Sequence, residues 1–523
     1  MRRLTRDVLL MAVATGVSRL FGLAREAAIA DRFGAGAAYD AFLIAFFVPH
    51  FLRSLLAEGA LSTAFVPVYT RLRVARETTI GAMQGADAAR LRSDADAFAS
   101  NLLTLLLVLF PVIVLVGVLL APVYVPFLAS GFGPEKLTLA IKLTRVVFPF
   151  IALVGFAAVF MGILNAHHRF FAASFAPVWF NVGMIVGVLG VAAAFPDRPI
   201  YGLGVGVLIG GSGMLISQWP ALRAAGFRFR MRLFPLHPAI GDLARRMGPA
   251  VLALAVAQIN LLVDNKIASH LPDGGISALQ YAMRLFQLPL GVFAVSIATA
   301  LLPRLSAATT RGDRSRFSRD LGTGFAASAF VLLPAMVGLC VIGRDVVRLL
   351  FEHGSFGAVD TTRTTGALVA YAAGLLPYGL VYLQTRACYA LGRTGLPVFA
   401  LVLAVGVNVG LDLALVGPLR EAGLALATAA AGLVNAGVLF FSLRRSVDWS
   451  RRLPMHLAKV GGGSAILAGL VYGARRLVGD VPPAVAVVVP TLVGMAFYGL
   501  YARVSGLWGL ILGLGAEHPA SED

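Results

Sequence analysis

Residues 14–72 decide the fold of this chain, and they read ATGVSRLFGLAREAAIADRFGAGAAYDAFLIAFFVPHFLRSLLAEGALSTAFVPVYTRL. The pattern predicts two long apolar helices joined by a short turn rich in glycine and alanine. The stretch also carries charges, although an arginine at the centre of a membrane helix costs about 2.5–3.5 kcal/mol on insertion scales. We therefore expect these charges to face water or protein. They are Arg19, Arg25, Glu26, Asp40, Arg53 and Glu58.

The first of these helices carries two polar stripes. Seven residues separate Ser18 from Arg25, and seven separate Arg19 from Glu26. Since each residue of an α-helix turns by about 100°, a spacing of seven returns to nearly the same side. One stripe thus presents a hydroxyl and a guanidinium group, and the neighbouring stripe presents a guanidinium group and a carboxylate.

The second helix adds Asp40 near its start and Arg53 farther along. Pro49 lies between them and predicts a kink, because proline lacks a backbone N–H group and leaves helix carbonyl groups free. The two helices therefore concentrate polar groups within segments that otherwise have the hydropathy of membrane spans.

Two interpretations of these charges remain open. In the first, the charges form the ion pairs Arg19–Glu26 and Arg53–Glu58. These ion pairs would only hold helices together. In the second, the charges line a water-filled cavity for an anionic substrate, because planar guanidinium groups match phosphate oxygens. Arg25 favours the second interpretation, since an unbalanced guanidinium group inside a helix bundle needs an anion.

The composition of the whole chain is that of a polytopic membrane protein. Of its 523 residues, 58% are hydrophobic and 13% are charged, whereas about 25% are charged in soluble domains. Apolar runs of about twenty residues predict membrane helices and exclude the alternating strands of an outer-membrane barrel. The net charge of +18 lies in short loops between apolar runs, which argues against nucleic acid as a partner.

Hydropathy predicts an all-α protein with about fourteen transmembrane helices. Their approximate limits are 8–31, 39–69, 99–122, 141–164, 174–195, 201–221, 248–270, 276–303, 321–343, 364–390, 397–416, 422–443, 457–476 and 483–506. Basic residues are concentrated in alternate loops, on the side that holds the amino terminus. Because such loops stay in the cytoplasm, we expect both termini to be cytoplasmic and the first span to be retained.

An internal repeat predicts two pseudo-symmetric six-helix bundles. The second span ends in AFVPVYTRL at 64–72, and the eighth ends in ALLPRLSA at 300–307. Six spans followed by six similar spans favour bundles that rock about a central site. The predicted parts are an N-terminal six-helix bundle at 1–222, an amphipathic cytoplasmic linker at 223–247, a C-terminal six-helix bundle at 248–446, two additional transmembrane helices at 447–510 and a cytoplasmic tail at 511–523.

Two local patterns predict surface and packing contacts. In the linker at 223–247, arginine alternates with aromatic and aliphatic residues, which is typical of a segment at the membrane interface. Gly202, Gly206 and Gly210 recur every four residues and predict a face on which helices pack closely.

Arg284 is a charged residue of the eighth predicted span. It could complete the anion site from the opposite bundle, because alternating access requires groups from both halves to hold one ligand. In the other interpretation, Arg284 pairs with a helix carbonyl group or with Glu352.

Two pairs of polar residues predict an oxygen-rich site for a hard cation. Asn260 and Asp264 are four residues apart and so lie on one face of their helix. Asn408 and Asp412 have the same spacing, and Thr428 can add another oxygen. The same residues could instead hydrogen-bond within the bundle or carry protons.

No enzyme motif is present in the sequence. It contains no HExxH, no phosphate-binding loop and no GxSxG. Cys340 and Cys388 both lie in apolar spans and are expected to be free thiols. We therefore expect a protein that is not an enzyme and that has no cofactor apart from a possible bound ion.

Three segments carry a resemblance to a known family. SRLFGLARE at 18–26, FGAGAAYDAF at 33–42 and FLRSLLAEGALSTAFVPVY at 51–69 resemble the N-terminal signature of the MurJ (MviN) family of lipid II flippases. This family belongs to the multidrug/oligosaccharidyl-lipid/polysaccharide exporter superfamily. The resemblance covers nearly the full length. It implies a multi-pass protein of the bacterial cytoplasmic (inner) membrane that translocates undecaprenyl-pyrophosphate-linked peptidoglycan precursor (lipid II) by alternating access, for cell-wall synthesis and cell shape.

The resemblance also implies roles for single residues. The positions that match functionally important ones of the family are Ser18, Arg19, Arg25, Asp40 and Arg53. The counterpart of Arg284 also lines the central cavity. Some family members bind sodium through residues matching Asp264, Asn408, Asp412 and Thr428, with a backbone carbonyl group near Leu424. The departures from the family pattern on the second helix are Phe47, His50 and Ser54.

The implied partners are the lipid-linked anionic glycan, membrane lipids and proteins of cell-wall synthesis. The resemblance also implies that the last two spans form a groove for the polyprenyl tail.

Three alternative functions remain. A flippase for another polyprenyl-linked polysaccharide precursor would share the cationic cavity. A multidrug antiporter of the same fold would need an acidic cavity, against which the arginines argue. A scaffold for cell-wall enzymes would not need arginines inside the membrane.

Overall fold

The computed structural model describes residues 2–54, 61–80, 86–449 and 452–509. Glu58 and the predicted tail at 511–523 lie outside the described residues. All regular structure in the described part is helical, as predicted, and it includes no strand. The chain divides into two compact units, Met1–His270 and Leu271–Asp523.

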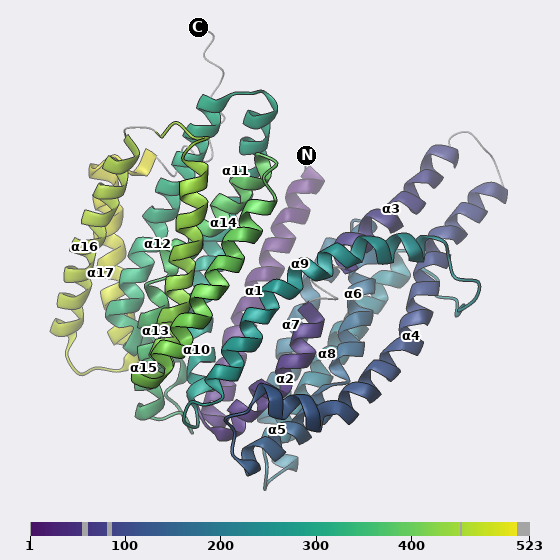
Figure 1. Cartoon of the computed structure of the whole chain (residues 1–523), viewed down its shortest axis with the longest axis horizontal. Coiled ribbons are helices and arrows are strands. Elements are labelled where there is room, and N and C mark those ends of the chain that lie inside the picture. The colour runs from purple at the N-terminus through teal and green to yellow at the C-terminus, as the bar shows by residue number, and fades with distance from the viewer. Residues whose placement is uncertain (1, 55–60, 81–85, 450–451, 510–523) are drawn as a thin grey trace. The chain divides into compact units, whose positions relative to one another are not determined.

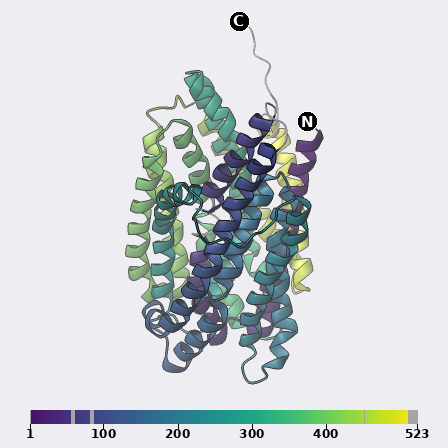
Figure 2. The ribbon, with the colours of Figure 1, turned by 90° about the vertical axis from the view of Figure 1, so that its right-hand side faces the viewer.

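The helices of the first unit are labelled in Figure 1. They are α1 (Arg2–Phe33), α2 (Ala37–Arg53), α3 (Leu61–Ile80), α4 (Ala86–Leu128), α5 (Pro134–Val147), α6 (Phe150–Ala166), α7 (Phe170–Leu189), the 3₁₀ helix η2 (Val191–Ala194), α8 (Ile200–Ala224) and α9 (Ala239–Ala268). Figure 2 shows the long helices of this unit, coloured purple to teal, running next to one another. Within the unit, α1 packs along α7, and α7 packs along α8.

The second unit begins with α10 and ends with α17. Its helices are α10 (Gly275–Pro289), the π-helix η3 (Leu290–Ala294), α11 (Val295–Thr310), α12 (Arg314–Phe351), α13 (Ala358–Ala372), α14 (Leu375–Ala390), α15 (Gly395–Leu443), α16 (Arg452–Val478) and α17 (Pro483–Val504). α16 and α17 pack against each other and against α12 (Figure 1). Arg475 of α16 donates two hydrogen bonds, of 2.7 and 2.9 Å, to the carboxylate of Asp345 of α12. This pair anchors the last two helices to the unit.

Nine helical segments in the described residues are long and apolar enough to cross a membrane, or ten if the bent pair α13 and α14 counts as one span. The predicted spans at 8–31, 39–69 and 248–270 correspond to α1, to α2 with α3, and to α9, which are not in that set. The predicted spans at 397–416 and 422–443 both fall in α15, whose backbone breaks at Arg420 (φ 49°, ψ −126°). The count of fourteen therefore remains a prediction.

α9 packs against α3 and α4 and so belongs to the first unit. Residues 248–270, which we predict to open the C-terminal bundle, lie in the first of the two contact-based units, and their place in a six-helix bundle remains a prediction. Arg71 of α3 donates a 2.6 Å hydrogen bond to Asp242 in the first turn of α9. This hydrogen bond, together with the charge of Arg246, lowers the pKa of Asp242 below its ordinary value. The other predicted domain limits remain predictions.

Side chains of α4 hold the linker between α8 and α9 in an extended form. Ser100 accepts a hydrogen bond from the backbone N–H of Arg230 (3.2 Å), and Thr104 accepts one from that of Arg232 (3.1 Å). The side-chain amide of Asn101 donates to the carbonyl group of Arg232 (2.8 Å). Alternate backbone groups therefore bond to α4, while apolar side chains of the linker stay exposed. These are Phe229, Met231, Phe234 and Leu236.

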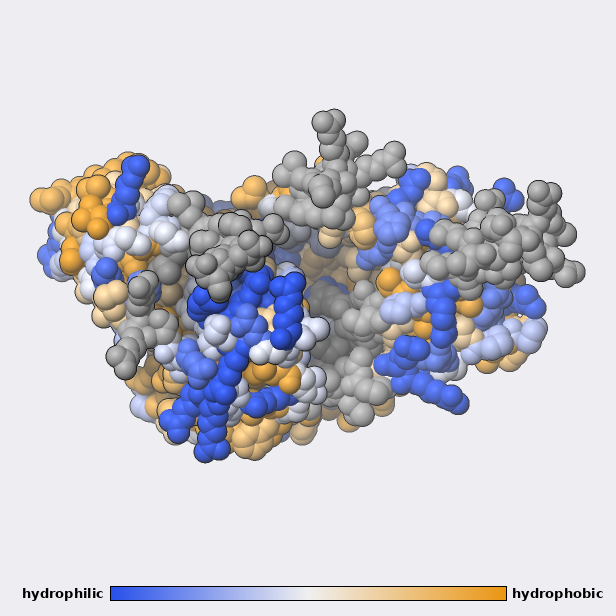
Figure 3. Space-filling view, turned by 90° about the horizontal axis from the view of Figure 1, so that it is seen from above, coloured by the Kyte–Doolittle hydropathy of each residue, from blue (hydrophilic) through white to orange (hydrophobic). Residues whose placement is uncertain are grey.

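Polar contacts group several loops at one end of the second unit. Arg314 binds the carboxylate of Asp448 (Nε–Oδ2 3.1 Å) and the carbonyl group of Arg445 (3.3 Å). Lys459 donates to the carbonyl group of Ser505 (2.9 Å). Figure 3 looks down on the upper end of Figure 1 and shows hydrophilic residues, in blue, gathered there. The predicted concentration of basic residues in loops on one side of a membrane remains a prediction.

Glycines bring the backbones of α7 and α8 into direct contact. A Cβ atom at Gly183 would lie 2.2 Å from the backbone nitrogen of Gly210, and one at Gly206 would lie 2.8 Å from the carbonyl oxygen of Gly183. A Cβ atom at Gly202 would lie 2.7 Å from the carbonyl oxygen of Gly187. The packing face predicted from the spacing of three glycines is therefore confirmed.

We expect Gly183→Ala to lower the thermal-unfolding midpoint of the purified protein. The new Cβ atom would force α7 away from α8, and overpacking of this kind costs about 1–3 kcal/mol. Gly16→Ala in α1 is the matched control, because no atom lies within 4 Å of the position that its Cβ atom would take. Equal midpoints for the two variants in the same detergent would contradict the close contact.

Candidate functional site

Arg25 and Glu26 form a buried ion pair in α1. Their exposed fractions are 8% and 2%. Nη2 of Arg25 binds Oε1 of Glu26, and the hydroxyl group of Tyr39 in α2 donates to Oε2 of Glu26 (3.2 Å). Both carboxylate oxygens therefore have a polar partner. Such compensation is necessary, because moving a charge from water into a protein interior costs roughly several kcal/mol, even after the protein relaxes around the charge.

α7 completes the surroundings of Arg25. Nη1 of Arg25 donates to Oδ1 of Asn181 (2.9 Å), and the guanidinium carbon lies 5.9 Å from the centre of the Phe180 ring. Nδ2 of Asn181 also donates to the carbonyl group of Ser18 (3.2 Å). One amide group of α7 thus contacts the side chain of Arg25 and the backbone carbonyl group of Ser18.

The expectation that Arg25 lacks a balancing carboxylate is wrong for this structure, because Glu26 provides one. The spacing argument placed Glu26 on the neighbouring stripe with Arg19. An arginine side chain is long enough to reach across the roughly 100° that separate consecutive residues of a helix. Ser18 and Arg19 themselves are half-buried.

Asp40 is 1% exposed in the first turn of α2. Its Oδ2 accepts a hydrogen bond of 2.8 Å from Nζ of Lys136 in α5. Nζ of Lys136 also lies 4.1 Å from the centre of the Phe132 ring. An ammonium group is therefore one of the groups that bind this carboxylate.

Arg53 is half-buried in the last turn of α2. Its Nη2 lies 3.0 Å from Nε2 of His50, one turn earlier. The next residue, Ser54, accepts a hydrogen bond of 2.8 Å from the side-chain amide of Gln258 in α9. His50 and Ser54 are positions at which the chain departs from the family pattern, and both contribute contacts at this end of α2.

Arg284 is half-buried in α10 of the second unit. When the amide oxygen of Gln280 faces it, this oxygen accepts hydrogen bonds from Nη2 (3.1 Å) and Nε (3.2 Å) of Arg284. Glu352, the alternative partner, accepts a hydrogen bond of 2.6 Å from Thr361. Since Arg284 and Arg25 belong to different units, a cavity that both residues line remains a prediction.

Asp264, the predicted sodium ligand of the first unit, lies in α9 together with Asn260. Nδ2 of Asn260 donates to Oδ2 of Asp264 (3.0 Å), which confirms that the two residues share a face. No cluster of three or more His, Cys, Asp or Glu side chains suited to a metal ion occurs in the described part of the chain. Any ion bound here would therefore rely on amide, hydroxyl and carbonyl oxygens in addition to carboxylates.

α15 carries the other three predicted ligands, in the second unit. Asn408 and Asp412 precede the break at Arg420 and are each 1% exposed. Thr428 follows the break, and its hydroxyl group donates to the carbonyl group of Leu424 (3.0 Å). These oxygen donors fit the preference of a hard cation. A joint site with Asp264 of the first unit remains a prediction.

Sequence reasoning missed Tyr39, Lys136 and Asn181. Asn181 had a detectable signal, because it is the polar residue within the apolar run APVWFNVG at 176–183. Lys136 is the basic residue at the end of the segment GFGPEK at 131–136, which lies between two predicted spans. Neither signal identifies the partner, because periodicity predicts the faces of one helix and not which helix packs against them.

The chain is similar to proteins of a known family. The family model described as lipid II flippase MurJ matches residues 29–490. A probable lipid II flippase MurJ of Rhizobium meliloti (strain 1021) is 35% identical over 471 residues, which cover 88% of this chain and 84% of the relative. A probable lipid II flippase MurJ of Thermotoga maritima is 31% identical over 503 residues, which cover 95% of this chain and 96% of the relative.

Solved structures show the same relationship. A lipid II flippase MurJ in an inward closed conformation matches with a TM-score of 0.78 at 27% identity, covering 95% of this chain and 99% of that chain. An inward-facing multidrug resistance transporter of the MATE family matches with a TM-score of 0.66 at 19% identity, covering 86% of this chain and 98% of that chain. The second match shows only that the fold is shared.

We expect Glu26→Gln to destabilise the purified protein strongly, because the buried charge of Arg25 would lose its carboxylate. Breaking a buried pair costs about 3–5 kcal/mol. The double variant Arg25→Met/Glu26→Gln removes both charges and should recover most of this loss, so the two effects should not add. Thermal unfolding of the unchanged protein, Arg25→Met, Glu26→Gln and the double variant measures the coupling free energy between the two charges.

The control for this cycle is Asp31→Asn, which removes an exposed carboxylate from the same helix. Its unfolding midpoint should stay close to that of the unchanged protein, because exposed charges contribute little. If Glu26→Gln behaved like Asp31→Asn, the ion pair would not be buried as described.

Proposed function

The chain belongs to the lipid II flippase MurJ family, and on that premise we propose that it translocates lipid II across the bacterial cytoplasmic membrane. The observation that carries the proposal is the family match over residues 29–490. Lipid II is the undecaprenyl-pyrophosphate-linked precursor of peptidoglycan, so its translocation serves cell-wall synthesis. The role is that of a transporter, and we assign no catalytic residue.

The headgroup of this lipid determines what the site must provide. A pyrophosphate is strongly anionic, and guanidinium groups bind phosphate oxygens through short, charge-assisted hydrogen bonds. We propose that arginines of both units hold the pyrophosphate, that Ser18 adds a donor and that Asp40 orients the cations. The arginines are Arg19, Arg25, Arg53 and Arg284.

The contacts of Arg25 support a mechanism in which the anion bound to its guanidinium group is exchanged during transport. A buried guanidinium group must be compensated in every conformation of the protein. In the absence of substrate, Glu26 compensates Arg25. When the pyrophosphate binds, its oxygens replace the carboxylate of Glu26, which keeps the hydrogen bond from Tyr39. The guanidinium group of Arg25 is then paired with an anion both before and after the substrate binds.

The proposed topology places α1, α2 with α3, and α9 among fourteen transmembrane helices, although their charges weaken the hydropathy signal. These helices would cross the membrane inside two bundles that shield their charges from lipid. The bundles would rock about the central site and expose it to each leaflet in turn, with both termini in the cytoplasm. α16 and α17, which carry exposed apolar side chains such as Ile466, Leu492 and Met495, would offer lipid-facing surface to the polyprenyl tail.

We propose that sodium binding or the membrane potential supplies the direction of transport. Moving one elementary charge across 100 mV is worth about 2.3 kcal/mol, which is enough to shift the populations of inward and outward states. Asp264, Asn408, Asp412 and Thr428 are the proposed sodium ligands, and the support for them is the set of buried oxygen donors in α9 and α15. Proteins of cell-wall synthesis are the proposed partners.

We expect that this chain restores growth to a bacterium depleted of its own lipid II flippase. Arg25→Met/Glu26→Gln should not restore growth at equal membrane abundance, because the site can no longer bind the pyrophosphate. Loss of one charge-assisted hydrogen bond costs about 1.5–3 kcal/mol, so translocation into purified vesicles should slow by roughly tenfold or more. Growth rate and a leaflet-specific assay of labelled lipid II are the measurements.

The double variant leaves no unpaired buried charge, so a loss of function cannot be attributed to unfolding if its helical content and elution are unchanged. Arg476→Ala, at an exposed position of α16, is the matched control and should restore growth fully. Growth supported by Arg25→Met/Glu26→Gln would rule out the anion-site mechanism. Failure of the unchanged chain to translocate lipid II, with success for another polyprenyl-linked glycan, would instead identify the alternative substrate.

A second expectation concerns the ion. In vesicles that hold the purified protein, an imposed sodium gradient should accelerate translocation several-fold over an equal potassium gradient. Asp412→Asn should remove this difference, because a neutral amide attracts a cation much less than a carboxylate does. Equal rates with sodium and potassium in the unchanged protein would show that the proposed ligands serve another purpose.

A further inference from the structure

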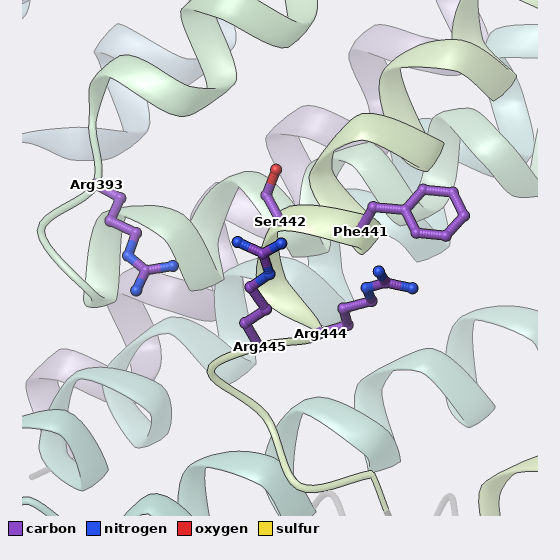
Figure 4. A pocket seen from close by; sticks show the side chains of 5 residues that line it. All are labelled: Arg393, Phe441, Ser442, Arg444 and Arg445. Atoms are coloured by element: carbon purple, nitrogen blue, oxygen red, sulfur yellow. The ribbon is translucent and has the colours of Figure 1, made fainter.

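A basic pocket lies where the start and the end of α15, which is broken at Arg420, come together in the second unit (Figure 4). It has a volume of about 520 Å³ and is lined by Arg393, Phe441, Ser442, Arg444 and Arg445. None of these residues belongs to the proposed lipid II site or the proposed sodium site. Any ligand of this pocket would therefore be bound separately from lipid II and sodium.

Two chain segments that are distant in sequence build the pocket. Arg393 lies in the short turn between α14 and α15, where its backbone N–H donates to the carbonyl group of Cys388 (2.9 Å). The other lining residues lie where α15 ends at Leu443. Figure 4 shows the side chains of Arg393 and Arg445 extending toward the same space, with the hydroxyl group of Ser442 nearby.

The pocket carries three positive charges that no carboxylate balances among the described residues. The acidic residue that follows the pocket in the sequence, Asp448, is already bound to Arg314 (Nε–Oδ2 3.1 Å). The guanidinium carbon of Arg444 lies 5.1 Å from the centre of the Phe441 ring, a contact that fixes its position but leaves its charge in place. Arg444 extends toward Phe441, away from Arg393, whereas Arg393 and Arg445 face the same space (Figure 4). Their like charges repel one another, so an anion bound between them would be stabilising.

The surface around the pocket is apolar along α15. Val398, Phe399 and Val402 follow Arg393 at the start of the helix, and their side chains are about half exposed or more. Leu433 and Phe441, at 62% and 59% exposed, precede Arg444 at its end. A ligand that reaches the arginines can therefore also lie against apolar side chains of the same helix.

We propose that this pocket binds the phosphate group of an anionic membrane phospholipid, with the acyl chains lying along α15. Arg393 and Arg445 account for the phosphate, and the hydroxyl group of Ser442 can donate a further hydrogen bond. The exposed apolar residues account for the choice of a lipid over a soluble anion, which would gain nothing from them. This site is independent of lipid II transport, and it would hold a structural lipid at the boundary between membrane and water.

The test measures lipid binding to the full-length protein by native mass spectrometry in a neutral detergent. The unchanged protein should bind phosphatidylglycerol in preference to phosphatidylcholine. Each basic residue near an anionic lipid contributes a factor of roughly five in affinity, so Arg393→Gln/Arg445→Gln should reduce binding of phosphatidylglycerol by roughly thirtyfold. Arg445→Gln alone should reduce it by roughly fivefold, which keeps the test available if the double variant folds poorly.

The matched control is Arg344→Gln/Arg476→Gln, which removes the same charge from exposed positions near the ends of α12 and α16. This variant should retain the binding of the unchanged protein. An equal loss in both double variants would show general charge attraction and overturn the proposal, as would unchanged binding in Arg393→Gln/Arg445→Gln. Displacement of the lipid by an equal concentration of glycerol 3-phosphate would identify a site for soluble anions and overturn the choice of a lipid.

Discussion

A positive charge inside an apolar helix bundle must be compensated, and the ion pair between Arg25 and Glu26 meets that constraint in the first unit. The compensation extends over three helices, because α2 contributes Tyr39 and α7 contributes Asn181. α7 is in turn held against α8 by a backbone contact that only glycine permits. Charge compensation and close packing therefore depend on each other: if α7 moved away, Arg25 would lose the amide group that binds it.

Hydropathy and periodicity predict the parts of this structure that depend on one helix at a time. They predicted the helical class, the glycine face of α8 and the shared face of Asn260 and Asp264. They could not predict that Lys136 binds Asp40, or that Asn181 binds Arg25, because these contacts depend on how separate helices rotate and pack. The pairing of Arg25 with Glu26 was missed for a different reason, since the helical-face argument ignores the reach of a long side chain.

The difference in span count has a physical origin in the same charges. A hydropathy window treats every charged residue as if it faced lipid, whereas Glu26 in α1 and Asp40 in α2 are buried against protein partners. Helices of this kind can lie in a membrane when neighbouring helices shield them. α15 differs from these helices, because two predicted spans lie in one long helix whose backbone is broken at Arg420. Pro418 precedes that break, and Arg420 adopts a positive φ of 49°, which an arginine rarely does.

The two groups of arginines differ in how their charge is compensated, and this difference limits what each can bind. Both Nη atoms of Arg25 bind protein groups, so under the proposed mechanism an anion binds there by replacing Glu26 with an equal or larger negative charge. A pyrophosphate meets that condition, and a neutral or cationic drug does not. Arg393, Arg444 and Arg445 are exposed, so solvent compensates them and any anion that also gains apolar contact can bind without replacing a protein group. Under the two proposals, the buried arginine would select a highly charged headgroup, and the exposed arginines would bind a ligand that remains in the membrane.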